Sequence, residues 1–79
     1  MLPMERAIVL VNLSPGTEEA TAAALRRTQG VAKVYQTYGL YDLLVVIEGE
    51  SEQAVKTTIT DKLRADKNIS STITMKVVG

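Results

Sequence analysis

Few side chains in this sequence could carry out chemistry. Histidine and cysteine are both absent, so the usual general base, metal ligand and nucleophile are missing together. Carboxylates, lysines and tyrosines remain, and Tyr41 and Asp42 follow Gly39 within QTYGLYDLLVVIEGE, residues 36–50. No second carboxylate occupies a matching place, because Glu48 falls at the far end of the apolar run. The sequence therefore predicts a protein that is not an enzyme and has no catalytic residue, metal site or cofactor.

The GLYD tetrad, residues 39–42, has two compatible interpretations. Gly39 can supply the positive φ of a tight turn, Tyr41 can stack and donate its hydroxyl, and Asp42 can accept backbone N–H groups. In the first interpretation Asp42 only ties the turn together. In the second, turn amides meet the carboxylate of a small zwitterion, while Asp42 or a nearby hydroxyl meets its ammonium group.

The last apolar segment adds further candidates. Thr72 and Thr74 are either the polar face of an edge strand or hydroxyls that line the same pocket as the tetrad. Met75 is expected in the core, and Tyr35 and Tyr38 are expected at a boundary between subunits.

Length and charge limit the classes of function. Seventy-nine residues allow one small domain with a thin core. Nine basic residues balance nine acidic ones, so no net field attracts nucleic acid or an anionic membrane. The apolar runs are far shorter than the roughly 20 residues of a membrane span, and no secretory signal is apparent. We expect a cytoplasmic, soluble protein that contacts neither membrane nor nucleic acid directly.

Hydrophobic periodicity and turn residues divide the chain into six elements. Two strands are almost wholly aliphatic, two alternate apolar with polar residues, and the helices begin near Thr17 and Ser51. A helix from Thr17 is expected to end at Gly30 in the C′ position. Only three residues, 39–41, are expected between the middle strands, which makes them an antiparallel hairpin. In chain order, the expected elements cover residues 6–13, 17–30, 31–38, 42–50, 52–67 and 70–78.

This order, βαββαβ, predicts an α+β fold of the ferredoxin-like type. Right-handed crossovers through both helices give a four-stranded antiparallel sheet with the two helices on one face. The first and third strands are central in that topology, and these are the two aliphatic ones. Pattern and topology therefore agree.

Both faces of the predicted central strands are apolar. Ile8 and Leu10 alternate with Val9 and Val11 along the first strand, and the third strand repeats the pattern. Leaving several aliphatic side chains of one face in water would cost on the order of 5 to 10 kcal/mol, comparable to the stability of a small domain. We expect a second copy to cover that face in an isologous dimer, although an apolar surface patch tolerated in water is the alternative.

The chain resembles a known family in its hairpin and last strand. GVAKVYQTY followed by GLYDLLVVIEG, then a helix and STITMKVV, is similar to the effector-binding domain of the Lrp/AsnC transcription regulators, also called the regulation-of-amino-acid-metabolism domain. The resemblance spans essentially the whole chain. It departs before the last strand, where DKNIS stands in place of the Pro-Gly-Val step common in the family.

The resemblance implies dimers that pair through their sheets and associate further, often as an octameric ring of four dimers. Amino-acid effectors are then expected in clefts between dimers. The expected effector-binding residues are Gly39, Leu40, Tyr41, Asp42, Thr72 and Thr74.

The resemblance also implies a role in transcription regulation. Regulators of this family carry a helix-turn-helix domain, but only MLPME precedes the first expected strand. We therefore expect residues 1–79 to be a single stand-alone effector-binding domain without helix-turn-helix. Such a domain would modulate transcription indirectly, alone or assembled with a full-length Lrp/AsnC regulator.

Two other interpretations of the sequence are compatible with the same element order and composition. An ACT-type amino-acid-sensing module shares the βαββαβ order, but its sheets associate side by side and it regulates a metabolic enzyme. A small dimeric α/β-barrel enzyme would need a deep polar pocket between the helices and the sheet of one subunit, where this sequence places aliphatic residues.

Overall fold

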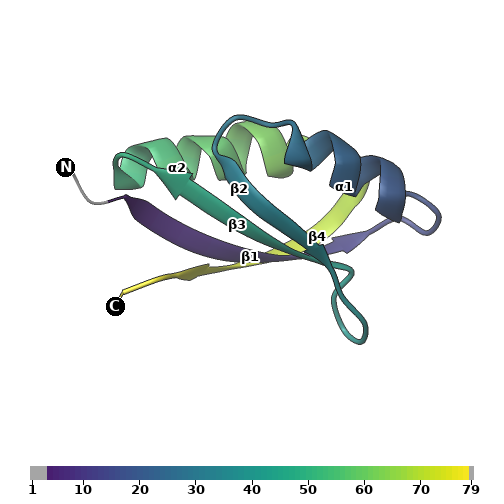
Figure 1. Cartoon of the computed structure of the whole chain (residues 1–79). Coiled ribbons are helices and arrows are strands. Elements are labelled where there is room, and N and C mark those ends of the chain that lie inside the picture. Colours follow the sequence, from purple (N-terminus) through teal and green to yellow (C-terminus); the bar gives the residue numbers. More distant parts are fainter. Residues whose placement is uncertain (1–3, 79) are drawn as a thin grey trace.

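The computed structural model describes residues 4–78, and its elements follow the predicted order. One layer of helices lies above one twisted sheet (Figure 1). The predicted helix from Thr17 is shorter than expected, because residues 27–30 form a turn instead of a last helical turn. In chain order the elements are β1 Glu5–Leu13, α1 Glu18–Arg26, β2 Val31–Gln36, β3 Leu43–Gly49, α2 Glu52–Thr58, the π-helical turn η1 Ile59–Leu63 and β4 Ile69–Lys76.

The sheet confirms the predicted ferredoxin-like topology. Within residues 4–78 it has four strands in the order β2-β3-β1-β4, with every neighbouring pair antiparallel. The two aliphatic strands, β1 and β3, are central, and their register pairs Val9 with Val45 and Leu10 with Leu44. The hydrophobic content of each strand thus matches its place in the sheet.

The core lies between the helices and one face of the sheet. Alternate residues of β1 and β3 point into it, so Val9, Val11 and Val45 have no exposed surface. Leu25 of α1 and Leu63 of η1 close it from above. The core is aliphatic throughout the described chain, and its buried polar residue, Thr21, has a hydroxyl without a hydrogen-bond partner.

The second helix begins as the sequence predicts and then widens. Ser51 is its N-cap and accepts a hydrogen bond from the N–H of Ala54 at 3.1 Å. From Ile59 the hydrogen bonding changes, and the N–H of Arg64 donates to the carbonyl of Ile59 at 2.9 Å. Apolar residues spaced every four positions drift by about 40° per step around an α-helix, and a wider turn rotates the next residue back and offsets that drift. The π turn therefore keeps Ile59 and Leu63 facing the core together.

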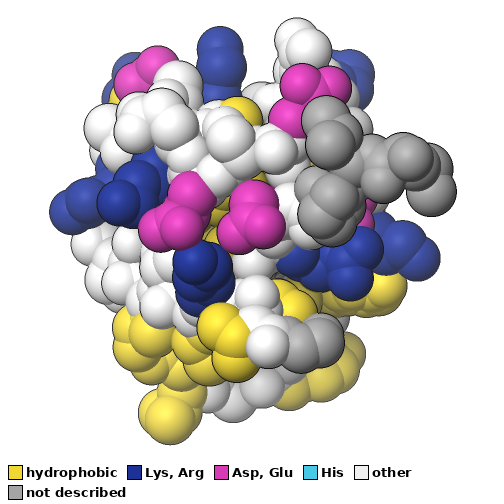
Figure 2. Space-filling view, turned by 90° about the vertical axis from the view of Figure 1, so that its left-hand side faces the viewer, with side chains coloured by type: hydrophobic (Ala, Val, Ile, Leu, Met, Phe, Trp, Pro, Cys, Tyr) yellow, Lys and Arg dark blue, Asp and Glu magenta, His cyan; other side chains and the backbone are white. Residues whose placement is uncertain are grey.

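The sheet face away from the helices is apolar, as predicted, and we call it the open face. The residues that alternate with the core positions along each strand project from it, and Figure 2 shows hydrophobic side chains gathered on the side away from the helices. Met75 was expected in the core, but its side chain is 45% exposed on this face, because Met75 pairs with Ile8 and not with a core position. The open face consists of Ile8, Leu10, Tyr35, Leu44, Val46, Ile73 and Met75.

Ion pairs flank the apolar surface at the sheet end where β1 begins. Arg6 and Glu48 are cross-strand partners at the border of the open face, with 2.6 Å between guanidinium and carboxylate. On the helix side, Lys76 of β4 donates to Glu52 of α2 at 2.8 Å. That hydrogen bond, with the attraction between the two charges, lowers the pKa of Glu52 and raises the pKa of Lys76.

Within residues 4–78, no helix has the length and apolarity of a membrane crossing.

Candidate functional site

The connection between β2 and β3, residues 37–42, projects from the sheet on the side away from the helices (Figure 1). It is longer than the predicted three residues, because β2 ends at Gln36 and β3 begins only at Leu43. Two hydrogen bonds close its base: the N–H of Thr37 donates to the carbonyl of Asp42 at 3.0 Å, and the Thr37 hydroxyl donates to the carbonyl of Tyr41 at 2.6 Å. Gly39 has φ +102°, which confirms the predicted positive φ of the turn.

Asp42 ties this hairpin to β1. Its N–H donates to the carbonyl of Val11 at 2.9 Å, and its carboxylate accepts the N–H of Leu13 at 2.7 Å. The residues before Asp42 lie outside the sheet, so no backbone carbonyl of β3 reaches the N–H of Leu13. The Asp42 carboxylate accepts that hydrogen bond instead. The half-buried Asp42 therefore has a structural role within the protomer.

We predict that Asp42→Ala lowers the free energy of unfolding by about 1 to 3 kcal/mol, because it leaves the Leu13 N–H without its charged acceptor. Asp42→Asn keeps an oxygen at the same position and should lose less than half as much. Urea unfolding of the three proteins at one protomer concentration measures the difference. An Asp42→Ala variant as stable as the parent protein would show that the carboxylate contributes nothing to the fold.

The tip of the hairpin offers apolar surface to a partner or ligand. Tyr38 is fully exposed and the Leu40 side chain is 85% exposed, whereas Tyr41 is half-buried. Such exposure of two large side chains on a short loop costs free energy in water and is relieved by contact with another surface.

The two predicted threonines lie apart from the hairpin. Thr72 pairs with Val11 and Thr74 with Val9, so their side chains project to the helix side of the sheet. Strand β1 lies between them and β3. Thr72 is therefore roughly 10 Å, or two strand spacings, across the sheet from Leu43, where the hairpin connection joins β3. Within one protomer the six predicted site residues therefore do not enclose a common cavity, and a shared cleft would need more than one copy.

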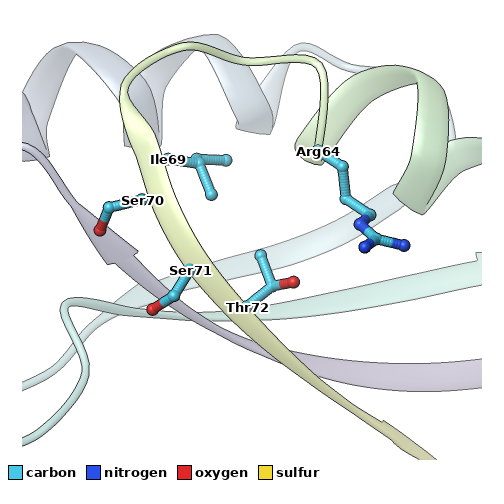
Figure 3. Close-up of a pocket in the computed structure, with 5 residues that line it drawn as sticks. All are labelled: Arg64, Ile69, Ser70, Ser71 and Thr72. Carbon is cyan, nitrogen blue, oxygen red and sulfur yellow. The ribbon is translucent and has the colours of Figure 1, made fainter.

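A residue that the sequence analysis did not select lies beside Thr72. Arg64, at the end of η1, borders a recess of about 340 Å³ that is also lined by Ile69, Ser70, Ser71 and Thr72 (Figure 3). In the sequence Arg64 is one of several cations in a charged segment near a helix end, where basic residues are common. Only the fold shows that its side chain reaches the edge of β4.

These features define a class: a ferredoxin-like α+β domain with an uncovered apolar sheet face and a projecting hairpin. A small α/β-barrel enzyme would instead have a polar pocket between helices and sheet, and in the described residues that space is filled by aliphatic side chains.

Comparison with known proteins identifies the family within this class of ferredoxin-like domains. Residues 6–78 match the Lrp/AsnC ligand binding domain, and the chain belongs to this family.

The relatives include a regulator and solved structures. The chain is 37% identical over 76 residues to the HTH-type transcriptional regulator LysM of Sulfurisphaera tokodaii, covering 91% of this chain and 54% of LysM. The crystal structure of FFRP-DM1 superposes with a TM-score of 0.90 at 30% identity, over 94% of this chain and 99% of that chain. A transcriptional regulator from Neisseria meningitidis, solved as an L-Met complex, shares the fold with a TM-score of 0.84 at 18% identity, over 95% of this chain and 50% of that chain.

The family match confirms the resemblance drawn from the hairpin and the last strand. It identifies residues 6–78 as an Lrp/AsnC ligand binding domain. The chain spans about half the length of LysM, 54%.

Proposed function

We propose that this protein is an amino-acid-binding and oligomerisation module that modulates transcription indirectly. The open face is the observation that carries the proposal. Seven apolar side chains on one sheet surface are only partly covered in the protomer, and soluble monomers rarely keep so large a contiguous patch in water. A second copy packed face to face would bury it in an isologous dimer.

The hairpin supports further assembly of these dimers. It projects on the same side as the open face and carries the exposed Tyr38 and Leu40 at its tip. Because the hairpin and the two threonines are separated within one protomer, we propose that effector clefts form between dimers, with the hairpin supplied by one protomer and the edge of β4 by another. A ring of four dimers is the arrangement that the family resemblance implies.

The proposed effector is a free amino acid. An amino acid needs one group that donates hydrogen bonds to its carboxylate and another that accepts them from its ammonium group, with apolar surface for its side chain. The hairpin provides apolar surface through Leu40 and Tyr41, and the hydroxyls of Thr72 and Thr74 provide polar contacts. The L-Met complex of the Neisseria regulator shows that a protein with this fold binds an amino acid.

We propose that residues 1–79 act as a single effector-binding domain, in the cytoplasm. FFRP-DM1 supports this, because the match covers 99% of that chain and shows that a domain of this extent forms an ordered structure. The partners are then a second copy, the effector and a full-length Lrp/AsnC regulator, with no direct contact to nucleic acid or membrane and no catalysis. The side-by-side association of ACT-type modules would leave the open face uncovered, so face-to-face pairing is preferred.

A ligand panel tests the effector role. We expect at least one of the twenty L-amino acids, at millimolar concentration, to raise the melting temperature by several degrees, since a ligand at 100 times its Kd stabilises the folded state by about 2.7 kcal/mol. Light scattering on the same samples reports whether the ligand changes the assembly. If all twenty leave melting temperature and molar mass unchanged, the effector role is wrong even if the protein is dimeric.

A further inference from the structure

The recess beside β4 combines groups that recognise an oxyanion. Figure 3 shows the Arg64 side chain descending from the end of η1 and the Thr72 side chain reaching toward it from β4. A guanidinium offers up to five N–H donors in a fixed plane, and a hydroxyl beside it offers one more. Such a pair is suited to a carboxylate, whose two oxygens accept parallel hydrogen bonds.

The backbone of β4 adds a donor at the same edge. The N–H of Val77 donates to the carbonyl of Arg6, so residues of β4 that alternate with Val77 bond to β1. Thr72 lies in the other set, and its N–H and C=O point to the free edge of the sheet. In the described chain no strand pairs with that edge. An oxyanion near Thr72 therefore has a backbone amide within the same region as the guanidinium.

The charge of Arg64 is not neutralised within the described protomer. The ion pairs of residues 4–78 join Arg6 to Glu48 and Lys76 to Glu5 and Glu52. The nearest acid along the chain, Asp66, accepts the N–H of Asn68 at 2.8 Å.

The serine hydroxyls of the recess both form hydrogen bonds with Asn12 of β1. The Ser70 hydroxyl donates to the carbonyl of Asn12 at 3.2 Å, and the Ser71 hydroxyl accepts from the Asn12 amide at 3.2 Å. Both bonds hold the start of β4 against β1. Ser71 pairs with Asn12 and projects to the face opposite Thr72, so Arg64 and Thr72 are the polar side chains of the recess available to a ligand on the helix side, with the aliphatic Ile69 beside them.

We infer that Arg64 and Thr72 bind the carboxylate of the effector at the free edge of β4. This inference rests on the proposed amino-acid function and assigns a contact that the sequence interpretation gave to the turn amides of residues 39–42. With the carboxylate on β4, the hairpin is left to contact the effector's side chain through Leu40 and Tyr41. The cleft is then complete only when two protomers meet.

Helix capping is the competing role for Arg64. A cation at the end of η1 interacts favourably with the unpaired carbonyls there, and this role needs no ligand. Neutralising Arg64 would then reduce the stability of the protein alone and leave its preference among ligands unchanged. The two roles are separated by measuring ligand preference as well as stability.

The test uses the amino acid that gives the largest melting shift in the panel of twenty, together with its primary amide, in which the carboxylate is replaced by an uncharged carboxamide. Isothermal titration of the whole protein with both probes is carried out on the parent, Arg64→Gln and Thr72→Val. Lys67→Gln is the matched control, because it removes one exposed positive charge from the adjacent turn without touching the recess.

We expect the parent to bind the acid about 10 to 100 times more tightly than the amide, the range for a hydrogen bond to a charged group. Arg64→Gln should weaken binding of the acid by a similar factor and reduce the acid-to-amide ratio to within about threefold of one, while Lys67→Gln keeps both values. Thr72→Val should weaken binding of the acid by a smaller factor than Arg64→Gln does.

Two results would overturn the inference while leaving the amino-acid function intact. One is an Arg64→Gln protein that binds the acid as the parent does, or that keeps its preference for acid over amide, which would return the carboxylate to the turn amides. The other is an Arg64→Gln protein whose molar mass falls and whose acid and amide affinities fall equally, which would assign Arg64 to a contact between copies. If no amino acid binds the parent, both the proposed function and this inference fail.

Discussion

A Leu10→Glu variant is expected to lose the dimer and sediment as a folded monomer. Leu10 lies in the middle of the open face, between Leu44 of β3 and Ile73 of β4. In a face-to-face dimer its side chain would be buried against the partner's sheet. A carboxylate at this position would lie unpaired in an apolar interface, so the dissociation constant should rise at least about a thousandfold, equivalent to about 4 kcal/mol.

Ala24→Glu is the matched control for this variant. Ala24 is exposed on α1, on the opposite side of the molecule from the open face. The Ala24→Glu substitution introduces the same charge on a helix, where glutamate is well tolerated. The oligomeric state of this variant should equal that of the parent. Sedimentation velocity from low to high micromolar concentration compares the three proteins, with circular dichroism to confirm folding. A Leu10→Glu protein that still sediments with the parent would exclude the open face as the interface.

Leu63→Ala is expected to cause the largest loss of stability. Leu63 has no exposed surface and packs η1 against the core. Its truncation removes the transfer free energy of the lost methyl groups and leaves a cavity, and such substitutions lower the free energy of unfolding by about 2 to 5 kcal/mol. In a domain of this length, that is a large part of a total of about 5 to 15 kcal/mol.

Val78→Ala provides the comparison for Leu63→Ala. It also truncates an aliphatic side chain, but Val78 is 87% exposed after the last strand and lies outside the open face and the hairpin, so the change should stay within about 0.5 kcal/mol. Chemical denaturation at equal protomer concentration measures both, because stability of a dimer depends on concentration. Equal losses in the two variants would contradict the placement of Leu63 in the core.

The topology was predictable because hydrophobic content differs between strands. The nearly continuous aliphatic runs of β1 and β3 are typical of central strands, which have a neighbouring strand on each side, and the alternating β4 fits an edge. The same alternation divided β1 into two sets of residues on opposite faces, but because both sets are apolar it did not predict which set faces the helices. For Met75 the prediction was wrong, because an apolar residue on an edge strand fits either face and only the register decides between them.

The candidate site was less predictable than the fold. Gly39 and Ser51 have local roles, a positive φ and an N-cap, which are encoded by residue type. Asp42 reaches Leu13, which is 29 positions away in the sequence, so its structural role depends on the register of β1 and β3. Arg64 was missed for the same reason, since its approach to β4 depends on where the second helix ends.

Sedimentation equilibrium of the unmodified protein at low micromolar concentration tests the central claim most directly. If a second copy covers the open face, the measured mass will be twice, or a larger even multiple of, the 8.6 kDa chain mass. A single species at 8.6 kDa over this range would mean that Leu10 and its apolar neighbours remain in contact with water, and the proposed assembly with its effector clefts would be wrong.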